Sequence, residues 1–179
     1  MCADNAAVHG PRRADAMPPD VVIEDDRWGS ANLDDLALRA LIALQVWLAI
    51  TGEIVVMGCD DDRIAALNAD FRGKPQPTNV LSWPSVEHLP HAPGEIPVLP
   101  DTEELGDIAI SYETCLGEAN AAGIPFDHHV MHLLIHAGLH LVGYDHETDP
   151  DAETMQAAER SVLETLSIPD PYDLDEPGN

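Results

Sequence analysis

Hydrophobic residues recur along the chain with two spacings, one typical of helices and one typical of strands. Between residues 33 and 48, leucines and alanines fall three and four positions apart, which predicts an amphipathic helix capped by Ser30 or Asn32. Further helical spacing predicts four more helices, at about 60–71, 112–122, 127–142 and 150–167. Short apolar runs predict four strands, at 21–23, 53–59, 80–83 and 105–111.

The order of these elements indicates the fold class. Strands and helices do not alternate regularly enough for a doubly wound sheet, so we expect an α+β domain. Its small mixed sheet of about four strands would be packed by about five helices. With 179 residues, the chain is long enough for one core plus tails. We expect a mobile N-terminal leader at 1–19, a single domain at 20–168 and an acidic C-terminal tail at 169–179.

Charge and cysteine usage restrict the possible functions. The chain has 33 acidic residues against 8 basic ones, a formal net charge of −25. Such a surface repels nucleic acid, because affinity for phosphate comes from clustered Lys and Arg, so any nucleic-acid role must depend on specific residues. The three cysteines form no C-x-x-C pair, and the longest apolar run is far shorter than the ~20 residues of a membrane span. We therefore expect a cytoplasmic protein with reduced thiols and no membrane association.

Histidine is concentrated in one region of the chain. Five of the nine histidines lie between residues 128 and 140, and His146 follows shortly after. His136 and His140 are four residues apart, so they share one face of the predicted helix. Gly143 is expected to end that helix and let the chain turn back, bringing His146 to the pair. Three imidazoles with a fourth position left open are typical of a catalytic rather than a structural zinc site.

A second trio of histidines competes with this one on periodicity alone. His132, His136 and His140 share a helical face, but they span about 12 Å at 1.5 Å per residue. Such a row is too long for one ion whose bonds are about 2 Å, so we predict the trio that includes the turn. His88 and His91 lie in a proline-rich segment, 85–103, that we expect to be a solvated surface loop.

Acidic residues also flank the third histidine of the predicted site. Asp145 and Glu147 stand on either side of His146. Either carboxylate could orient an imidazole through its second ring nitrogen. Helix capping and plain solvent exposure explain these residues equally well.

The histidine spacing also matches the metzincin protease pattern H-E-x-x-H-x-x-G-x-x-H. That pattern places a general-base glutamate directly after the first histidine, where this chain has Ala137. A methyl group accepts no proton, which disfavours peptide hydrolysis by that route. A zincin-like metallopeptidase with a different base remains an alternative.

The segment from His136 to His146, HAGLHLVGYDH, resembles the H-G-x-L-H-L-x-G-Y-D-H signature of the YbeY family of bacterial endoribonucleases. The resemblance covers about residues 50–166. It includes further blocks upstream: Leu67-Asn68, Phe71-Arg72-Gly-Lys74, PTNVLSWP at 77–84 and LGDI at 105–108. Three positions differ from the usual family pattern: Ala137 replaces a glycine, and Pro75 and Asn79 replace acidic residues.

This resemblance implies a zincin-like metal helix with one Zn²⁺ on His136, His140 and His146, the only cofactor implied. It also implies that Arg72 is a functional residue of the cleft, where a guanidinium can bind two phosphate oxygens in a fork. An ordinary surface ion pair is the alternative for Arg72.

The implied activity is a zinc-dependent endoribonuclease that prefers single strands. The resemblance places it in ribosomal RNA maturation, at the 3′ end of the small-subunit RNA, and in ribosome quality control. The implied partners are precursor ribosomal RNA, the small ribosomal subunit and its assembly factors. A non-enzymatic assembly factor with a structural zinc is a further alternative.

Overall fold

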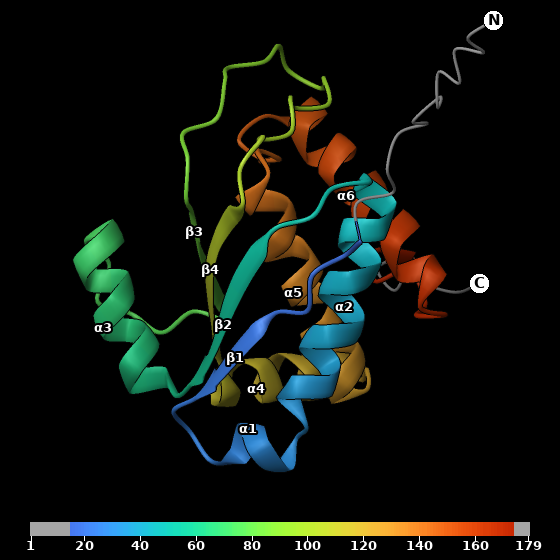
Figure 1. Ribbon diagram of the computed structural model, residues 1–179. Coiled ribbons are helices and arrows are strands. Elements are labelled where there is room, and N and C mark those ends of the chain that lie inside the picture. Colours follow the sequence, from blue (N-terminus) through green and yellow to red (C-terminus); the bar gives the residue numbers. More distant parts are fainter. Residues whose placement is uncertain (1–14, 174–179) are drawn as a thin grey trace, which may run out of the picture.

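The computed structural model describes residues 15–173, so most of the predicted leader and the end of the predicted tail lie outside it (Figure 1). The described chain forms ten elements in this order: β1 (Asp20–Ile23), α1 (Arg27–Ser30), α2 (Leu33–Leu48), β2 (Glu53–Cys59), α3 (Asp61–Arg72), β3 (Val80–Pro84), β4 (Glu104–Ser111), α4 (Tyr112–Ala122), α5 (Phe126–Leu141) and α6 (Asp149–Thr165). The α+β class and the four strands are confirmed. The described part has six helices rather than five, because the four-residue α1 is too short to show a hydrophobic period.

The four strands form one mixed sheet in the order β1-β2-β4-β3. β1, β2 and β4 run parallel to one another, and β3 runs antiparallel to β4. β3 is an edge strand that ends at Pro84, opposite Gly106. A proline has no backbone N–H to donate, so an edge strand is a place where it is tolerated.

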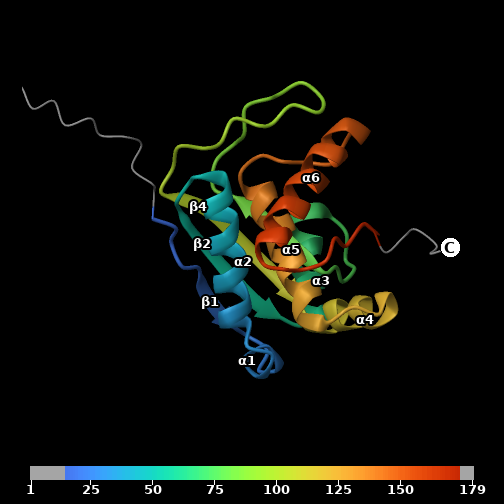
Figure 2. The ribbon, with the colours of Figure 1, turned by 90° about the vertical axis from the view of Figure 1, so that its right-hand side faces the viewer.

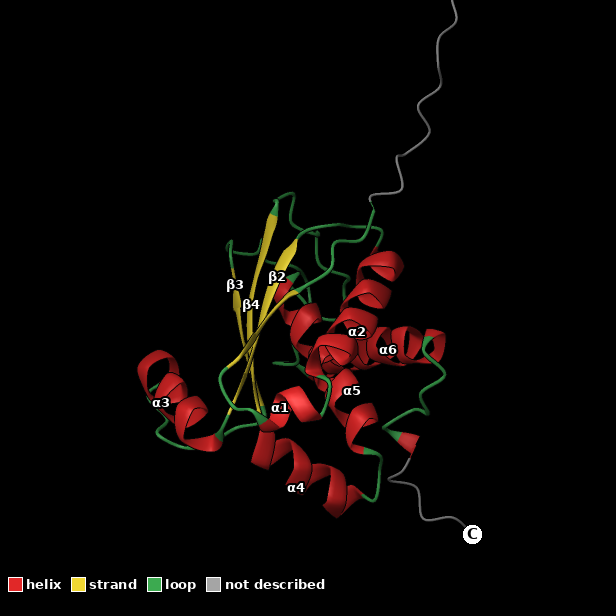
Figure 3. Ribbon diagram, turned by 60° about the horizontal axis from the view of Figure 1, so that its bottom comes forward, coloured by secondary structure: helices red, strands yellow, loops and turns green. Residues whose placement is uncertain are grey.

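The two faces of the sheet are covered unequally. Viewed along the sheet, α2, α5 and α6 lie on one side, and α3 stands alone on the other (Figure 3). The largest group of buried apolar residues lies between the sheet and the three helices, with Ile54 and Val56 of β2 and Ile108 and Ile110 of β4 almost fully buried. Burial of this apolar surface is the main stabilising contribution to the fold.

Helix α5 is the central helix of this layer: it contacts α2, α6 and the strands β3 and β4, and it lies beside α2 in Figure 2. Nine of its residues are buried, from Val130 to Leu141, so the helix is apolar on most of its sides. A Cβ at Gly138 would lie 2.4 Å from Cδ2 of Leu44, which shows how closely α2 approaches α5 at this point. This packing fixes the helix that carries His136 and His140.

The segment between β3 and β4, residues 85–103, has no regular secondary structure, as expected. It is fastened to α6: Gly94 N donates to Asp151 Oδ1 at 2.9 Å, and Thr154 Oγ1 donates to Gly94 O at 2.8 Å. In Figure 1 this loop rises beside the N-terminal end of α6. Within residues 15–173, no helix combines the length and the apolar character needed to cross a bilayer.

Candidate metal centre and its cleft

The C-terminal end of helix α5 and the turn after it position the last two histidines of the predicted trio, His140 and His146. Gly143 adopts a φ of 108°, a conformation that L residues with a side chain rarely adopt, and the chain reverses there. Tyr144 N then donates to Leu139 O at 3.0 Å. The same turn brings the Tyr144 carbonyl to His140, whose Nδ1 lies 2.9 Å from the oxygen.

The structure brings His136, His140 and His146 together. One ring nitrogen from each lies within 4.8 Å of the others. The ring centroids are separated by 4.6 Å, 5.5 Å and 5.0 Å. His136 and His140 are half-buried and His146 is exposed, so the group faces solvent on one side. His132 is not part of the group, as its place one turn further back on α5 predicts.

The hydrogen bonds of these rings show that they fit a metal ion. His136 Nδ1 lies 2.6 Å from the Glu159 carboxylate, and His140 Nδ1 faces a backbone carbonyl, so both Nδ1 atoms must donate. In the neutral rings both Nε2 atoms are therefore bare, yet they lie only 3.1 Å apart. Two lone pairs at this distance repel each other unless a cation lies between them. Two nitrogens on one tetrahedral zinc lie roughly 3.3 Å apart with bonds of about 2.05 Å, which matches this spacing.

Glu159 is the residue of this site that the sequence pattern did not reveal. Its side chain is fully buried on α6 and its Oε1 accepts the hydrogen bond from His136. A signal was present, because Glu159 lies four residues after Met155 and four before Leu163, both buried on the inward stripe of α6. An acid at such a position needs a partner, since a buried charge without one is strongly unfavourable.

For Asp145 and Glu147 the sequence left an orienting role open beside helix capping and solvent exposure, and neither bonds to Nδ1 of His136 or His140. Asp145 Oδ2 lies 3.8 Å from His91 Nε2, and Asp145 Oδ1 accepts from Glu147 N at 3.3 Å. Both acids line the cleft, but their polar contacts are with His91 and with each other rather than with the rings of α5.

Two pKa values at the site are shifted, one by burial and one by hydrogen bonds. Burial, together with the neighbouring His136 and His146, lowers the pKa of His140 to about 4. Burial alone would raise the pKa of Glu159, but hydrogen bonds from His132 and His136 outweigh it and lower that pKa to about 2. At neutral pH the site thus holds a neutral His140 ring and an ionised Glu159, the protonation states that metal binding requires.

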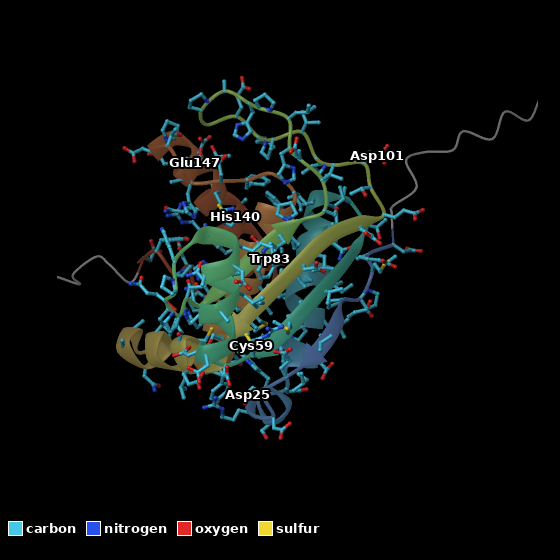
Figure 4. The ribbon with its side chains drawn as sticks, turned by 90° about the vertical axis from the view of Figure 1, so that its left-hand side faces the viewer. Asp25, Cys59, Trp83, Asp101, His140 and Glu147 are labelled. Atoms are coloured by element: carbon cyan, nitrogen blue, oxygen red, sulfur yellow. The ribbon has the colours of Figure 1, made fainter. Side chains whose placement is uncertain are left out.

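The histidine group lies in a cleft of about 880 Å³ that also contains Arg72. One wall comes from the C-terminal end of α3 and from β3, and the other from α5 and the turn after it. In Figure 4, viewed from the side of α3, His140 and Trp83 are labelled close together, below the loop that carries Asp101. Ala137, where the protease pattern has its base, also lines the cleft.

Arg72 has no acidic partner in the described part of the chain. The other four arginines among residues 15–173 each form an ion pair with an Asp or Glu: Arg27, Arg39, Arg63 and Arg160. Arg72 is exposed at the last position of α3. The alternative of an ordinary surface ion pair is therefore not what the structure shows, and the guanidinium is available to a ligand.

His88 and His91 differ from expectation, because the loop that carries them folds over the cleft rather than into solvent. Both line the cleft with the three histidines. His91 is only 13% exposed and lies 3.8 Å from Asp145 and from Asp151. The hydrogen bonds of Gly94 to α6 explain this, since they draw the loop inward.

Comparison with known proteins identifies the family of this chain. The family model described as Endoribonuclease YbeY matches residues 24–167. Endoribonuclease YbeY of Paracoccus denitrificans is 63% identical over 154 residues, which are 86% of this chain and 88% of that protein. The proteins of that name from Rhodopseudomonas palustris (strain HaA2) and Ruegeria sp. are 51% and 49% identical, covering 91% and 88% of this chain and 86% and 97% of their own.

A solved structure is also similar. The solution structure of TM1509 from Thermotoga maritima superposes with a TM-score of 0.49 at 23% identity, over 90% of this chain and 99% of that one. Family membership does not depend on it, because the sequence matches span most of each protein compared. The chain belongs to the YbeY family.

Proposed function

We propose that this chain is a cytoplasmic, zinc-dependent endoribonuclease whose single domain, residues 20–168, cleaves single-stranded parts of precursor ribosomal RNA. Its substrate would be the 3′ end of the small-subunit RNA, with a further role in ribosome quality control alongside the small subunit and its assembly factors. The names of the related proteins support the nuclease activity. In this proposal α5 acts as a zincin-like metal helix.

One observation carries the proposal: a single cleft holds both the three-histidine group and the one described arginine without an acidic partner. Cleavage of a phosphodiester builds negative charge on the phosphate oxygens. When bound, a divalent ion supplies Lewis-acid polarisation of such an oxygen or activates water. Arg72 would bind the phosphate in a bidentate fork and orient it toward the histidines.

An aromatic pair in the same cleft supports the preference for single strands. Phe71 is 64% exposed, and its ring packs edge-on against Trp83 with centroids 5.1 Å apart. Both line the cleft beside Arg72. Only an unpaired strand can splay its bases onto an aromatic ring, because duplex RNA keeps its bases stacked inside the helix.

The strongly acidic composition limits where RNA can bind. A formal net charge of −25 repels phosphate over most of the surface. Binding is therefore confined to the cleft, where Arg72 and the ion supply positive charge. Lys74, the single lysine of the chain, follows two residues later and does not line the cleft. Few phosphate contacts also mean that RNA affinity should depend only weakly on salt.

A cleavage assay on three substrates tests the proposal. The zinc-loaded protein would be incubated with a single-stranded RNA, with the same RNA annealed to its complement, and with casein. We expect internal cleavage of the single strand, little cleavage of the duplex and none of casein. Digestion of casein without RNA cleavage would instead favour the metallopeptidase.

The same assay on His140→Ala separates a catalytic metal from a structural one. A catalytic ion contributes little to the free energy of folding, so the variant should fold but fail to cleave RNA. If the variant instead unfolds, as a structural zinc site predicts, the non-enzymatic assembly factor becomes the better explanation.

A further inference from the structure

A buried network of hydrogen bonds connects the end of the described chain to the histidine group. Its centre is Glu159, whose carboxylate has no exposed surface. Oε1 lies 2.6 Å from His136 Nδ1 and 3.4 Å from His132 Nε2. Oε2 accepts a hydrogen bond from the hydroxyl of Tyr172. Both oxygens of this buried carboxylate are therefore bonded, as a buried charge requires.

Tyr172 reaches Glu159 because the chain folds back after α6. The reversal begins at Ser167, which has a φ of 57°, and Ile168 N bonds to Leu163 O at 3.0 Å. Asp170 then pairs with Arg160, with Oδ2 and Nε 2.9 Å apart. The Arg160 guanidinium also lies over the Tyr172 ring, 5.2 Å from its centroid.

The network can act on only one of the three rings. His140 takes its orientation from the Tyr144 carbonyl, a backbone atom that no side chain can replace. His136 takes its orientation from a side chain, which in turn is held by Tyr172. An ionised carboxylate on Nδ1–H fixes the tautomer that leaves Nε2 bare and makes that nitrogen a stronger ligand.

We propose that Glu159 and Tyr172 are positioning residues for a divalent cation: they hold the His136 ring in the orientation and tautomer that present Nε2 to the ion. The C-terminal segment after α6 therefore sets the metal affinity of a site at the far end of α5. This inference rests on the metal site of the proposed function and is independent of RNA cleavage.

Zinc affinity of the full-length protein tests this inference, measured by competition with a chromophoric chelator. Glu159→Gln keeps the shape and most hydrogen bonds but removes the charge, and we expect zinc binding about 10–100-fold weaker. Tyr172→Phe removes one hydroxyl far from the ion, and we expect about a tenfold loss, the lower end of that range.

Two matched variants serve as controls. Glu164→Gln neutralises an exposed glutamate of the same helix, and Tyr112→Phe removes a hydroxyl that lies outside the network. Both should bind zinc as the wild type does. Thermal unfolding of all four variants without metal shows whether each is folded, so that lost affinity is not mistaken for lost structure.

The outcomes distinguish this inference from the proposed function. If the wild type binds zinc and Glu159→Gln and Tyr172→Phe bind it equally well, the positioning role is overturned and the metal site stands. If the wild type binds no divalent ion, the metal site of the proposed function falls and this inference falls with it.

A second measurement needs no metal. Nitrogen NMR of the metal-free protein reports which nitrogen of the His136 ring carries the proton. We expect the Nδ1–H tautomer alone in the wild type and a mixture in Glu159→Leu, which has a similar volume and no acceptor. A merely structural role for Glu159 predicts the same single tautomer in both proteins. That result would contradict the proposed positioning role.

Discussion

The two walls of the cleft differ in how firmly their polar groups are held. On the α5 wall, His136 and His140 each have an Nδ1 bonded to a fixed acceptor. On the opposite wall, residues 71–77 are exposed, and Arg72 has no ion-pair partner in the described chain. Under the proposed function, the half of the cleft that would hold the ion is therefore prepared before the substrate arrives, while the half that would meet the substrate is left free to adjust to it.

The largest effect is expected on the prepared wall. His140→Ala removes a ligand, and we expect it to abolish stoichiometric zinc binding and lower RNA cleavage by roughly a thousandfold, since the ion supplies several kcal/mol at 1.36 kcal/mol per tenfold. Elemental analysis and single-turnover cleavage check both parts. Full metal content in this variant would contradict the three-histidine site.

A smaller effect is expected on the open wall. Arg72→Ala removes a donor to the phosphate, and we expect kcat/KM for RNA to fall about a hundredfold with zinc content unchanged. Arg72→Lys keeps the charge but loses the fork, so it should restore activity only in part. Lys74→Ala is the matched control, and if it were as damaging as Arg72→Ala, a diffuse basic patch would replace the specific contact.

The aromatic pair should affect binding more than chemistry. Phe71→Ala removes one stacking surface worth about 1–3 kcal/mol, so we expect KM for a single-stranded RNA to rise about tenfold while kcat is unchanged. Phe71→Tyr keeps the ring and should retain wild-type kinetics. Trp fluorescence of the wild type and of Trp83→Phe, titrated with RNA, tests the contact directly. If RNA changes the emission of both proteins equally, bases do not reach this pair.

The last prediction concerns the acid stability of the metal-free protein rather than its activity. The pKa of His140 is lowered to about 4 by burial and by its histidine neighbours, below the ordinary value of about 6.5. Between these values the unfolded chain binds a proton that the folded protein does not, so falling pH favours unfolding by at most about 1.4 kcal/mol per pH unit.

Urea unfolding with a chelator, measured in steps from about pH 7 to pH 4.5, checks this slope. His140→Gln should flatten it, whereas Arg72→Ala, on the open wall, should leave it unchanged. An equal slope in His140→Gln would show that other groups cause the acid instability.

Much of the fold follows from local patterns in the sequence. Strand β2 and helix α4 have the predicted limits, and α5 and α6 differ from prediction by one or two residues at their ends. These elements are long and their hydrophobic spacing is regular, so packing reinforces what the local sequence favours. The four-residue α1 could not be predicted in this way, because its place depends on the packing of Trp28 against the distant Tyr112 and Phe126.

The candidate site shows the same difference between features that local sequence determines and features that depend on long-range packing. The approach of His136, His140 and His146 could be predicted because helix period and a glycine turn are local features. Glu159 and Tyr172 could not, because they meet His136 only through the packing of α6 on α5 and the return of the chain after it. The inward position of His91 likewise depends on a distant contact, between Gly94 and Asp151.

Helix α6 contacts both the loop that folds over the cleft and the ring of His136 within it. Near its N-terminus Asp151 and Thr154 hold the loop at Gly94, and two turns later Glu159 holds the ring of His136. Sliding α6 along its axis would therefore widen the entrance and loosen the grip on the ion in one movement. Under the proposed function, a substitution that shifts α6 would therefore change both the fit of the substrate and the binding of the cation.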